Sequence, residues 1–394
     1  MRVLHVIPSL AAAHGGPSRA MGLFEQALSL AGVQMEIATT DDDGPGRRLL
    51  REPVEAARSI PCHRFAKRSE FYKFAPGLGV WLMQHVADYD LVHIHALFSF
   101  SSMAAASAAL RAGVPYIVRP LGTLNRYGME RRRPWLKQAS LRWLDGPVLR
   151  KADAVHFTAA AEQEEAALLG IPMNGAVVPL AVDAMAEPDS QALWQRFPQL
   201  QQGRYLLFLS RLDPKKNVEA LLAAMVLLKA DFPDLLLVLV GDGERGYVAQ
   251  LEQRAITLGI ADRLLWTGFL DGALKAAVLQ GAAVFALPSF SENFGIAAAE
   301  ALLAGLPCVL GLGVAIAAEV ERAGAGLAIE PEAAAAARAI SHYLGNDDAR
   351  VAAGAAARKL ARCHYSVDAM GDRLIDLYTA VLDRHTRALG LGHR

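Results

Sequence analysis

Short apolar runs of strand length alternate with longer runs of helical periodicity along almost the whole chain. Parallel strands need a crossover between them, which is usually a helix, so this alternation predicts parallel α/β sheets. In the first half we expect strands at residues 3–7, 33–39, 91–95, 116–118 and 154–157. In the second half we expect them at 205–209, 235–240, 264–267, 284–287 and 308–310.

Length and composition limit the possible classes of protein. The 394 residues suffice for two to three domains, and 53% of them are hydrophobic, which suits large buried sheets. The 40 basic residues balance the 40 acidic ones, so we expect no nucleic acid as a main partner. Cys62, Cys308 and Cys363 form no close pair in the sequence. They indicate a reducing compartment, and we therefore expect a cytoplasmic protein.

Two apolar segments resemble membrane signals. Residues 1–13 carry one arginine ahead of an apolar stretch, but His5, Pro8 and Ser9 interrupt that stretch. We therefore expect a buried strand there rather than a signal peptide. Residues 301–318 carry no charge, but glycines and a proline break them, so we expect a helix end, a strand and a loop.

A candidate binding motif lies at residues 291–302. The run 283–288 reads as a buried strand stopped by a proline, and a helix is expected from about residue 297. Glu292 then lies on the loop above the strand, and Glu300 lies about two turns along the helix. Backbone N–H groups near Gly295 lie at the helix N-terminus, which suits anionic oxygens. Two carboxylates beside an anion site suggest a pocket for a sugar joined to phosphate.

Three further motifs follow predicted strands. They are Ser210–Asn217 (SRLDPKKN), the glycine-rich end of a strand at 239–243 (LVGDG), and Gly15–Ser18 (GGPS) near the N-terminus. Ligands of open α/β sheets bind at the carboxyl ends of the strands, so these motifs could face one cleft.

Together the four motifs resemble, in order along the chain, those of the family 4 retaining glycosyltransferases with their Glu-x7-Glu element. This family is also described as glycosyl transferases group 1. The resemblance implies the GT-B fold, in which two Rossmann-like domains face a central cleft and a C-terminal helix crosses back to the N-terminal domain. We expect an N-terminal acceptor-binding domain at 1–185, a linker at 186–203, a C-terminal donor-binding domain at 204–365, and the C-terminal helix and tail at 366–394.

The resemblance also assigns roles in the C-terminal half. Arg211 and Lys216 would stabilise the diphosphate leaving group of a UDP- or GDP-linked sugar, and Glu292 would contact the donor sugar. We count these three as catalytic. Glu300 would bind the ribose hydroxyls, and backbone N–H groups would come from Asn293, Phe294 and Gly295. No cofactor and no divalent metal are expected.

The N-terminal half departs from the family pattern at one place. Many members carry a histidine after the strand near residue 118, and here Leu121 stands at that point. Arg119 could take over part of its role. Gly15 and Gly16 would let the backbone approach a ligand closely ahead of a helix.

Two histidines share one face of a predicted strand. His93 and His95 alternate along it, but no Asp, Glu or Cys companion is evident, so we expect no metal there. His95, nearer the end of the strand, is predicted to line the acceptor cleft.

The segment 126–137 combines Arg126, Arg131, Arg132, Arg133, Trp135 and Lys137. We favour a solvated helix start, because a run of charges is usually a solvated face. The alternative is a peripheral contact with the inner face of the membrane or with a lipid diphosphate acceptor.

The function expected from the resemblance is transfer of a hexose-type sugar to a saccharide or lipid-linked acceptor, with surface polysaccharide synthesis as an association only. A glycoside hydrolase or phosphorylase that uses Glu292 and Glu300 is one alternative. A non-catalytic nucleotide-sugar-binding subunit is another.

Overall fold

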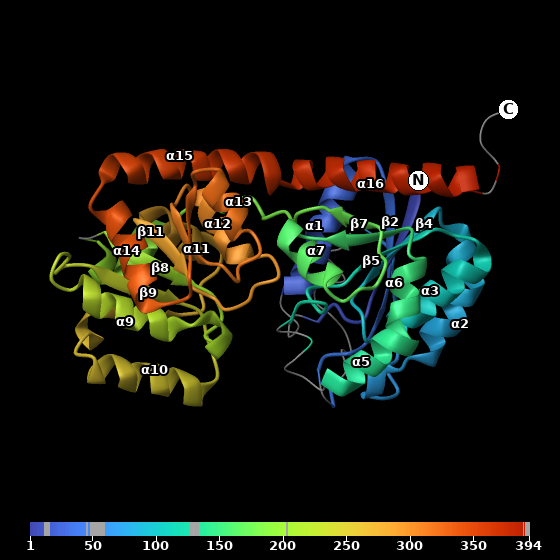
Figure 1. Ribbon diagram of the computed structural model, residues 1–394, viewed down its shortest axis with the longest axis horizontal. Helices are drawn as coiled ribbons and strands as arrows, with labels where there is room; N and C mark the ends of the chain where they lie inside the picture. The colour runs from blue at the N-terminus through green and yellow to red at the C-terminus, as the bar shows by residue number, and fades with distance from the viewer. Residues whose placement is uncertain are drawn as a thin grey trace. The chain divides into compact units, whose positions relative to one another are not determined.

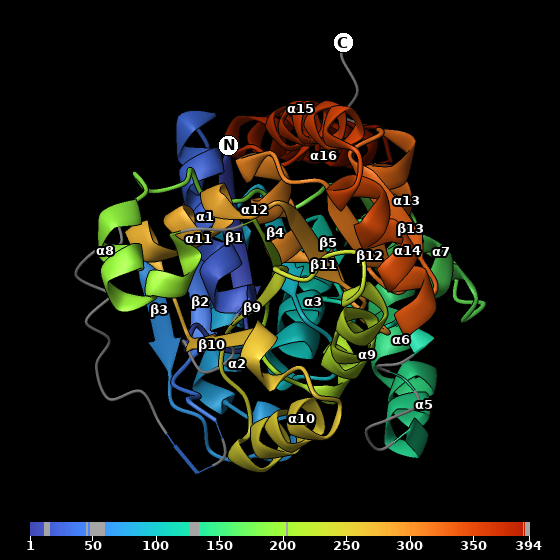
Figure 2. The ribbon, with the colours of Figure 1, turned by 90° about the vertical axis from the view of Figure 1, so that its left-hand side faces the viewer.

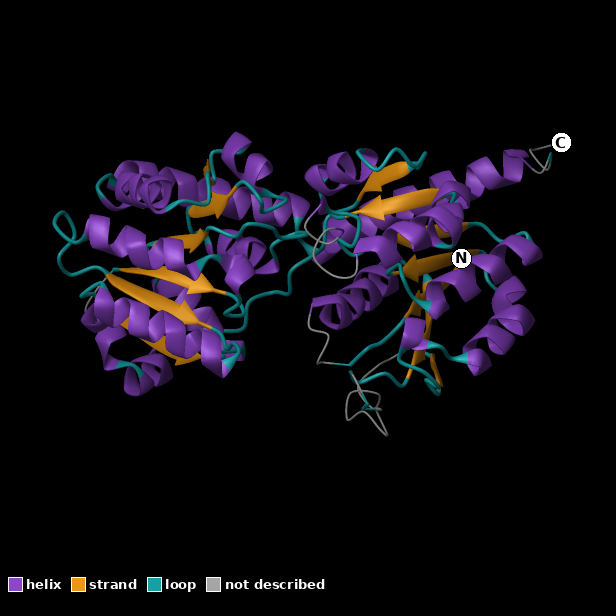
Figure 3. Ribbon diagram, turned by 60° about the horizontal axis from the view of Figure 1, so that its bottom comes forward, coloured by secondary structure: helices purple, strands orange, loops and turns teal. Residues whose placement is uncertain are grey.

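The computed structural model describes residues 1–11, 16–44, 46–47, 60–126, 129, 134–201, 204–388 and 390. The chain divides into two compact units. Unit 1 comprises Met1–Ala181 together with Val367–Arg394, and unit 2 comprises Val182–Ser366. In each unit, helices cover the faces of a parallel sheet (Figure 3). This arrangement confirms the predicted pair of Rossmann-like α/β folds.

The described strands of unit 1 form one sheet in the order β3-β2-β1-β4-β5-β6-β7, and every pairing in it is parallel. These strands are β1 (Arg2–Ile7), β2 (Gln34–Thr40), β3 (Cys62–Phe65), β4 (Leu91–His95), β5 (Tyr116–Arg119), β6 (Ala154–Phe157) and β7 (Gly175–Val177). The central strands β1, β4 and β5 are buried along most of their length, which explains why most of their residues are apolar.

The helices of unit 1 connect these strands. They are α1 (Gly16–Leu30), α2 (Pro76–His85), α3 (Phe100–Ala112), α5 (Pro134–Trp143), α6 (Asp145–Lys151) and α7 (Ala160–Ala167), with 3-10 turns η3 (Phe71–Lys73) and η4 (Val86–Asp88). Helix α3 shows why such a helix starts and ends where it does. The Ser99 side chain caps its first turn, and Gly113 closes it in the left-handed conformation.

The last helix, α16 (Val367–Ala388), belongs to unit 1. It packs along α1, the first helix of the chain (Figure 1). Its buried face includes Leu374, Tyr378 and Val381. A side chain at Gly371 would come within 3.1 Å of the Ala27 carbonyl, so a glycine allows the close contact. The prediction that the C-terminal helix returns to the first domain is confirmed.

The described strands of unit 2 form a second parallel sheet in the order β10-β9-β8-β11-β12-β13. They are β8 (Tyr205–Leu209), β9 (Leu236–Val240), β10 (Leu264–Gly268), β11 (Val284–Leu287), β12 (Cys308–Gly311) and β13 (Gly326–Ile329). The helices are α8 (Ser190–Arg196), α9 (Val218–Leu228), α10 (Arg245–Thr257), α11 (Gly272–Gly281), α12 (Ile296–Ala304), α13 (Ala317–Arg322), α14 (Ala333–Leu344) and α15 (Asp347–His364), with 3-10 turns η5 (Pro198–Leu200), η6 (Pro214–Lys216) and η7 (Ala261–Arg263). Helices α9 and α14 lie side by side (Figure 2).

Several details go beyond the sequence prediction. The segment 186–203, expected as a linker, contains α8, because the Asp189 carboxylate caps that helix and Leu193 is buried. Strands β3, β7 and β13 were not expected; each is short and lies at the edge of its sheet, where the apolar pattern is weakest. Residues 301–318 form a helix end, a strand and a turn, as predicted. Among the described residues, no helix is long and apolar enough to cross a membrane.

Strained backbone concentrates where strands end. Among the described residues other than glycine, six have positive φ, and all six lie in loops that follow strands. Tyr72 and Lys73 follow β3, Ala96 and Phe98 follow β4, Leu121 follows β5, and Asn217 follows β8. Such strain persists only where the surrounding structure enforces it, and it gathers at functional sites. The carboxyl edges of both sheets are therefore where a site is expected.

Candidate active site

The loop after β8 holds Arg211 and Lys216 in a fixed turn. Asp213 caps the 3-10 turn η6 by accepting a hydrogen bond from the Lys215 backbone N–H at 3.0 Å. Asn217, with φ of 56°, follows it and starts α9. Its side-chain amide donates to the carbonyls of Pro288 and Pro331, which ties this loop to the loop after β11. These hydrogen bonds therefore fix the backbone of the loop that carries Arg211 and Lys216.

Arg211 borders a hollow of about 470 Å³. The opposite wall comes from the loop after β9 and the start of α10, including Gly243, Glu244 and Tyr247. Gly243 is required for this packing, because a side chain there would lie 2.4 Å from the Leu212 carbonyl oxygen. The predicted glycine-rich strand end thus forms part of a cavity beside Arg211.

Lys216 forms an ion pair with Glu292, and both side chains are largely buried. The Ser289 hydroxyl also donates to the same Glu292 oxygen, at 3.3 Å. Burial, together with the charges of Lys215 and Arg211, lowers the pKa of Lys216 to about 7. The Glu292 carboxylate favours the charged form of the lysine. The structure thus brings together two of the three residues predicted to be catalytic, and Arg211 is close enough to influence the charge of Lys216.

The main chain of Glu292 is held from both sides. Its N–H donates to the Gly313 carbonyl at 2.7 Å, and its carbonyl accepts from the Ala315 N–H at 3.1 Å. A side chain at Gly313 would lie 2.1 Å from the Phe290 carbonyl oxygen, so only glycine permits this approach. The loop after β12 therefore positions Glu292.

Glu300 lies on α12 and is buried, with 8% of its surface exposed. It accepts a hydrogen bond from the Lys275 Nζ of α11 at 2.8 Å. A buried carboxylate needs such a partner. Lys275 is thus a residue that the sequence reasoning missed; its only sequence signal is a lysine within an otherwise apolar helix.

The three residues ahead of α12 have different surroundings. Phe294 is buried and packs edge-on against Tyr365, with ring centroids 5.4 Å apart. Gly295 is the residue before the first turn of α12 and has φ of 96°, a conformation that favours glycine. Asn293 precedes them in the same loop. The backbone here adopts the helix-start geometry that the sequence predicted.

In unit 1, the structure describes only one of the two predicted glycines. Gly15 lies outside the described residues, and Gly16 is the exposed first residue of α1. Nearby, the Ser18 hydroxyl donates to the Ala11 carbonyl at 2.8 Å. The strand-to-helix connection after β1 therefore leads into α1 as expected.

His95 and Arg119 end neighbouring strands and are paired in register. Both are buried, with 0% and 2% of their surface exposed. The Arg119 guanidinium lies over the ring of Phe24, 5.1 Å from its centroid. Burial lowers the pKa of Arg119 to about 10, and the nearby Glu162 carboxylate opposes this shift. Arg119 is therefore a buried cation at neutral pH.

Four buried histidines belong to a chain of hydrogen bonds in which each donor and acceptor can be assigned in turn. His156 Nε2 lies 2.8 Å from the Val178 carbonyl, which can only accept, so this nitrogen carries the proton. His156 Nδ1 is then bare and accepts from His93 Nε2 at 3.2 Å. His93 Nδ1 in turn accepts from the Tyr378 hydroxyl of α16 at 2.8 Å.

The same logic continues to the end of β4. The Tyr378 oxygen accepts from His5 Nε2 at 3.4 Å, and His5 Nδ1 accepts from His95 Nε2 at 2.9 Å. His95 Nδ1 is therefore a bare acceptor, and it has no partner among the described residues. Arg119 Nε and Nη1 are likewise buried donors without a partner among them. The cluster thus ends at the carboxyl edge of the sheet in a buried acceptor and buried donors that have no partner among the described residues.

The histidine cluster also bears on metal binding. In the described part of the chain, His5, His93 and His95 each bring a ligand atom within 4.8 Å of one another. His5 reaches the other two because β1 lies beside β4. His95 Nδ1 has a lone pair without a partner, but a cation would also have to take the lone pairs of His5 and His93 that accept hydrogen bonds, next to the positive charge of Arg119. The arrangement favours neutral, hydrogen-bonded rings over a metal centre.

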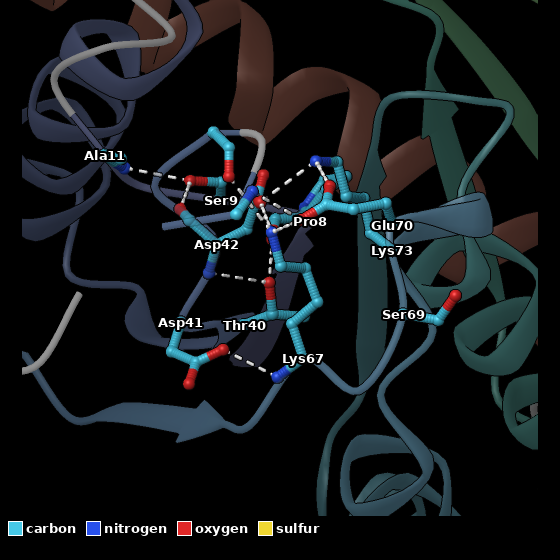
Figure 4. Close-up of polar contacts among 12 residues, drawn as sticks. Pro8, Ser9, Ala11, Thr40, Asp41, Asp42, Lys67, Ser69, Glu70 and Lys73 are labelled. Atoms are coloured by element: carbon cyan, nitrogen blue, oxygen red, sulfur yellow. Dashed lines mark hydrogen bonds and ion pairs between the residues drawn. The ribbon is translucent and has the colours of Figure 1, made fainter. Parts of the chain in front are cut away.

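A buried ion-pair cluster at the ends of β2 and β3 was not foreseen (Figure 4). Asp42 is 1% exposed and pairs with Lys67 and with Lys73, the latter at 3.0 Å. Glu70 accepts from the same two lysines, at 2.6 and 2.7 Å. Burial would raise the pKa of Asp42, but the hydrogen bonds from the lysines hold it below its usual range. The cluster fixes the loop after β3 to the loop after β2.

The segment 126–137 is only partly described. Residues 127–128 and 130–133, which include three of its arginines, lie outside the described residues. Trp135 is 68% exposed, and the Lys137 ammonium lies 5.7 Å from the centroid of Phe98. The described start of α5 therefore carries an exposed tryptophan and a lysine that contacts Phe98.

Comparison with known proteins matches both halves of the chain to family models. Residues 191–360 match the family of glycosyl transferases group 1, and residues 15–181 match the glycosyl transferase 4-like domain. A phosphatidyl-myo-inositol mannosyltransferase of Mycolicibacterium smegmatis is 37% identical over 134 residues, which are 34% of this chain and 33% of that protein. A D-inositol 3-phosphate glycosyltransferase of Streptomyces scabiei is 27% identical over 407 aligned positions, covering 93% of this chain and 87% of the relative.

Among solved structures, HepE of Anabaena in complex with UDP superposes with a TM-score of 0.79 at 21% identity. That match covers 96% of this chain and all of the other. At this identity the likeness establishes the fold alone.

Proposed function

The chain belongs to the glycosyl transferases group 1 family of GT-B-fold glycosyltransferases, and on this premise we propose that it is a retaining enzyme that transfers a hexose without a divalent metal. The proposed donor is a UDP- or GDP-linked sugar, and the proposed acceptor is a saccharide or a lipid-linked saccharide. The observation that carries the proposal is the cluster of Arg211, Lys216 and Glu292 at the carboxyl edge of the unit 2 sheet.

Arg211 and Lys216 are suited to the diphosphate of the donor. Arg211 can fork across two phosphate oxygens, and Lys216 supplies a point charge. The pKa of Lys216 is lowered to about 7, so an arriving diphosphate would raise it and fix the ammonium form. This gain grows as charge develops on the leaving oxygen. Both residues would therefore act most strongly in the transition state.

The two glutamates would hold the rest of the donor. Glu292 keeps one oxygen on Lys216 and can accept a sugar hydroxyl on the other. Glu300, held by Lys275, would accept hydrogen bonds from the ribose. Asn293, Phe294 and Gly295 would present backbone N–H groups ahead of α12. Retention is inherited from the family resemblance, with attack on the same face that the leaving phosphate departs from.

The open groups of unit 1 suit an acceptor hydroxyl. A hydroxyl donates one hydrogen bond and accepts others, and it would match the bare His95 Nδ1 together with Arg119 Nε–H. Arg119 would thereby serve near the place where many family members carry the histidine that Leu121 replaces. Gly15 and Gly16, ahead of α1, would let the ligand approach the backbone.

Nucleotide binding tests this proposal first. Thermal unfolding is followed with UDP, GDP, ADP and TDP in the presence of EDTA, because a ligand that binds only the folded state raises the melting temperature. We expect a shift with one diphosphate that Arg211→Ala abolishes. Arg338→Ala, at an exposed arginine of α14, is the matched control.

Two results would contradict the proposal. The first is release of free sugar from a simple glycoside without nucleotide, which would indicate a hydrolase. The second is tight nucleotide binding with no turnover on any acceptor, which would indicate a binding subunit.

A further inference from the structure

The loop after β3, residues 66–75, has a polar side and an apolar side. Lys67 and Lys73 pair with both Asp42 and Glu70 and anchor the loop at the carboxyl edge of the sheet. Phe71 and Phe74, on the same short stretch, are 66% and 42% exposed. Because ion pairs hold this loop in place, the exposure of the two phenyl rings is a fixed feature of the fold and requires a physical explanation.

The exposed rings border an apolar groove of about 300 Å³ in unit 1. One wall is the loop after β3, and the opposite wall comes from the start of α3 and the end of α5, with Phe100, Met103 and Leu144. The rings of Phe74 and Phe100 meet edge to face, with centroids 4.8 Å apart. Leu144, on the far wall, is 45% exposed. Apolar surface gathered in this way marks an interaction site rather than scattered exposure.

The groove has rigid walls. The Phe98 backbone N–H donates to the buried Asp145 carboxylate at 3.0 Å, and the Ser140 hydroxyl donates to the same carboxylate. Tyr72 in turn is hydrogen-bonded to Ser140. Tyr72, which lines the groove, and Phe98, two residues before Phe100 of the opposite wall, have φ of 52° and 56°, so this network holds two strained residues. Hydrogen bonds therefore fix the segments that border the groove.

Cations and indole rings lie beside the groove. The Arg142 guanidinium lies over the ring of Trp143, 5.2 Å from its centroid, and Trp143 is 70% exposed next to Leu144. The Lys137 ammonium, near the start of α5, lies 5.7 Å from the centroid of the Phe98 ring. No acidic residue occurs within α5. Exposed tryptophan and basic side chains beside an apolar channel match an amphiphile that has a hydrocarbon chain and an anionic group.

We infer that this groove receives the hydrocarbon chain of a phosphate-linked lipid acceptor, whose phosphate is met by the cations of α5. The inference rests on the proposed function, because it specifies the acceptor of that reaction. The saccharide carried by the lipid would then lie toward the carboxyl edge, where His95 and Arg119 present their open hydrogen-bonding groups. The enzyme would accept a lipid-borne sugar in preference to the same sugar free in solution.

Dodecyl phosphate, titrated below its micelle concentration into the full chain, tests the groove directly by tryptophan fluorescence and calorimetry. We expect saturable binding at one site. Inorganic phosphate, which lacks the chain, and dodecyl maltoside, which lacks the charge, should bind at least about tenfold more weakly. Equal affinity for dodecyl phosphate and dodecyl maltoside would overturn the assignment of an anionic lipid.

Variants locate the site. Phe71→Ser and Leu144→Ser replace exposed groove residues and should each weaken dodecyl phosphate binding about tenfold. Leu168→Ser, at an apolar residue of unit 1 that is 84% exposed, is the matched control and should leave binding unchanged. Unchanged binding in both groove variants would overturn the inference. So would a wild-type dimer that Phe71→Ser converts to a monomer, because a second copy would then occupy the groove.

The nucleotide titration separates this inference from the proposed function. A protein that binds a nucleoside diphosphate but not dodecyl phosphate overturns the inference alone. A protein that binds dodecyl phosphate but no nucleotide overturns the proposed function, and with it the role of the groove as an acceptor site. Unchanged hydrogen exchange in peptides from β4 would show that unit 1 stays folded in Phe71→Ser and Leu144→Ser.

Discussion

Mild acid is expected to destabilise unit 1 through its four buried histidines. Burial is the main cause that lowers the pKa of His5 and of His156 to about 3, and it also lowers the pKa values of His93 and His95 well below the usual range. Arg119 on β5 faces the cluster and lowers them further. The folded protein therefore keeps all four rings neutral at pH values where the unfolded chain protonates them.

The sign and size of the effect follow from proton linkage. The folded-state pKa values are depressed below the unfolded value of about 6.5, so the stability is complete above pH 6.5 and is lost as the pH falls toward 3. Between pH 7.5 and 5.5, each histidine that stays neutral only in the folded state costs about 1.4 kcal/mol of unfolding free energy. Four such residues cost roughly 5 kcal/mol, which equals the whole stability of a marginal domain.

Urea unfolding of the full chain at the two pH values measures this loss. Hydrogen exchange in peptides from β4 and β8 assigns it to unit 1 or unit 2. His156→Gln keeps an N–H donor for the Val178 carbonyl but cannot titrate, and it should reduce the pH-dependent loss by about 1.4 kcal/mol. His342→Gln, at an exposed position of α14, is the control and should leave the loss unchanged.

Two outcomes would refute this reasoning. One is a loss of unfolding free energy below about 1.4 kcal/mol between pH 7.5 and 5.5 in the wild-type protein, because a single neutral histidine would account for that much. The other is a full pH dependence that persists in His156→Gln.

Two further substitutions test pairs seen in the structure. Glu300→Gln should weaken nucleotide binding about tenfold or more through the lost ribose contact. The double variant with Lys275→Met should restore stability in a urea titration but should not restore affinity in a nucleotide titration. Equal nucleotide affinity in wild type and Glu300→Gln would contradict the ribose role. Asp42→Asn should cost about 3 kcal/mol of unfolding free energy, because it leaves Lys67 buried without a full counter-charge. Asp347→Asn, which breaks an exposed pair, should cost less than about 1 kcal/mol in the same urea assay, and similar costs for the two variants would contradict the argument.

Local sequence patterns predicted much of the fold. The central strands are mostly apolar because helices cover both of their faces, and the run 301–318 is broken by glycine and proline where the chain turns. Glu292 and Glu300 could be placed on a loop and a helix because a proline and a glycine mark the ends of those elements. These features depend on neighbours within a few residues.

The contacts that complete the site depend on distant segments. His5 and His95 are 90 residues apart, and they meet only because β1 lies between β2 and β4. Lys275 reaches Glu300 across two helices that follow different strands. Asp42 and Lys67 come from the ends of adjacent strands. The order of strands in a sheet is set by packing across the whole unit, so no local pattern identifies such partners.

The packing of α16 on α1 has a consequence for the order of events during synthesis. Residues 1–181 are synthesised before unit 2, yet the core of unit 1 lacks Tyr378 until α16 has been made. All residues of unit 2 are available before α16 emerges. Domains generally fold as their residues become available, so unit 2 can reach its final fold while unit 1 still waits for its last helix. The half of the protein that is made first is therefore completed last.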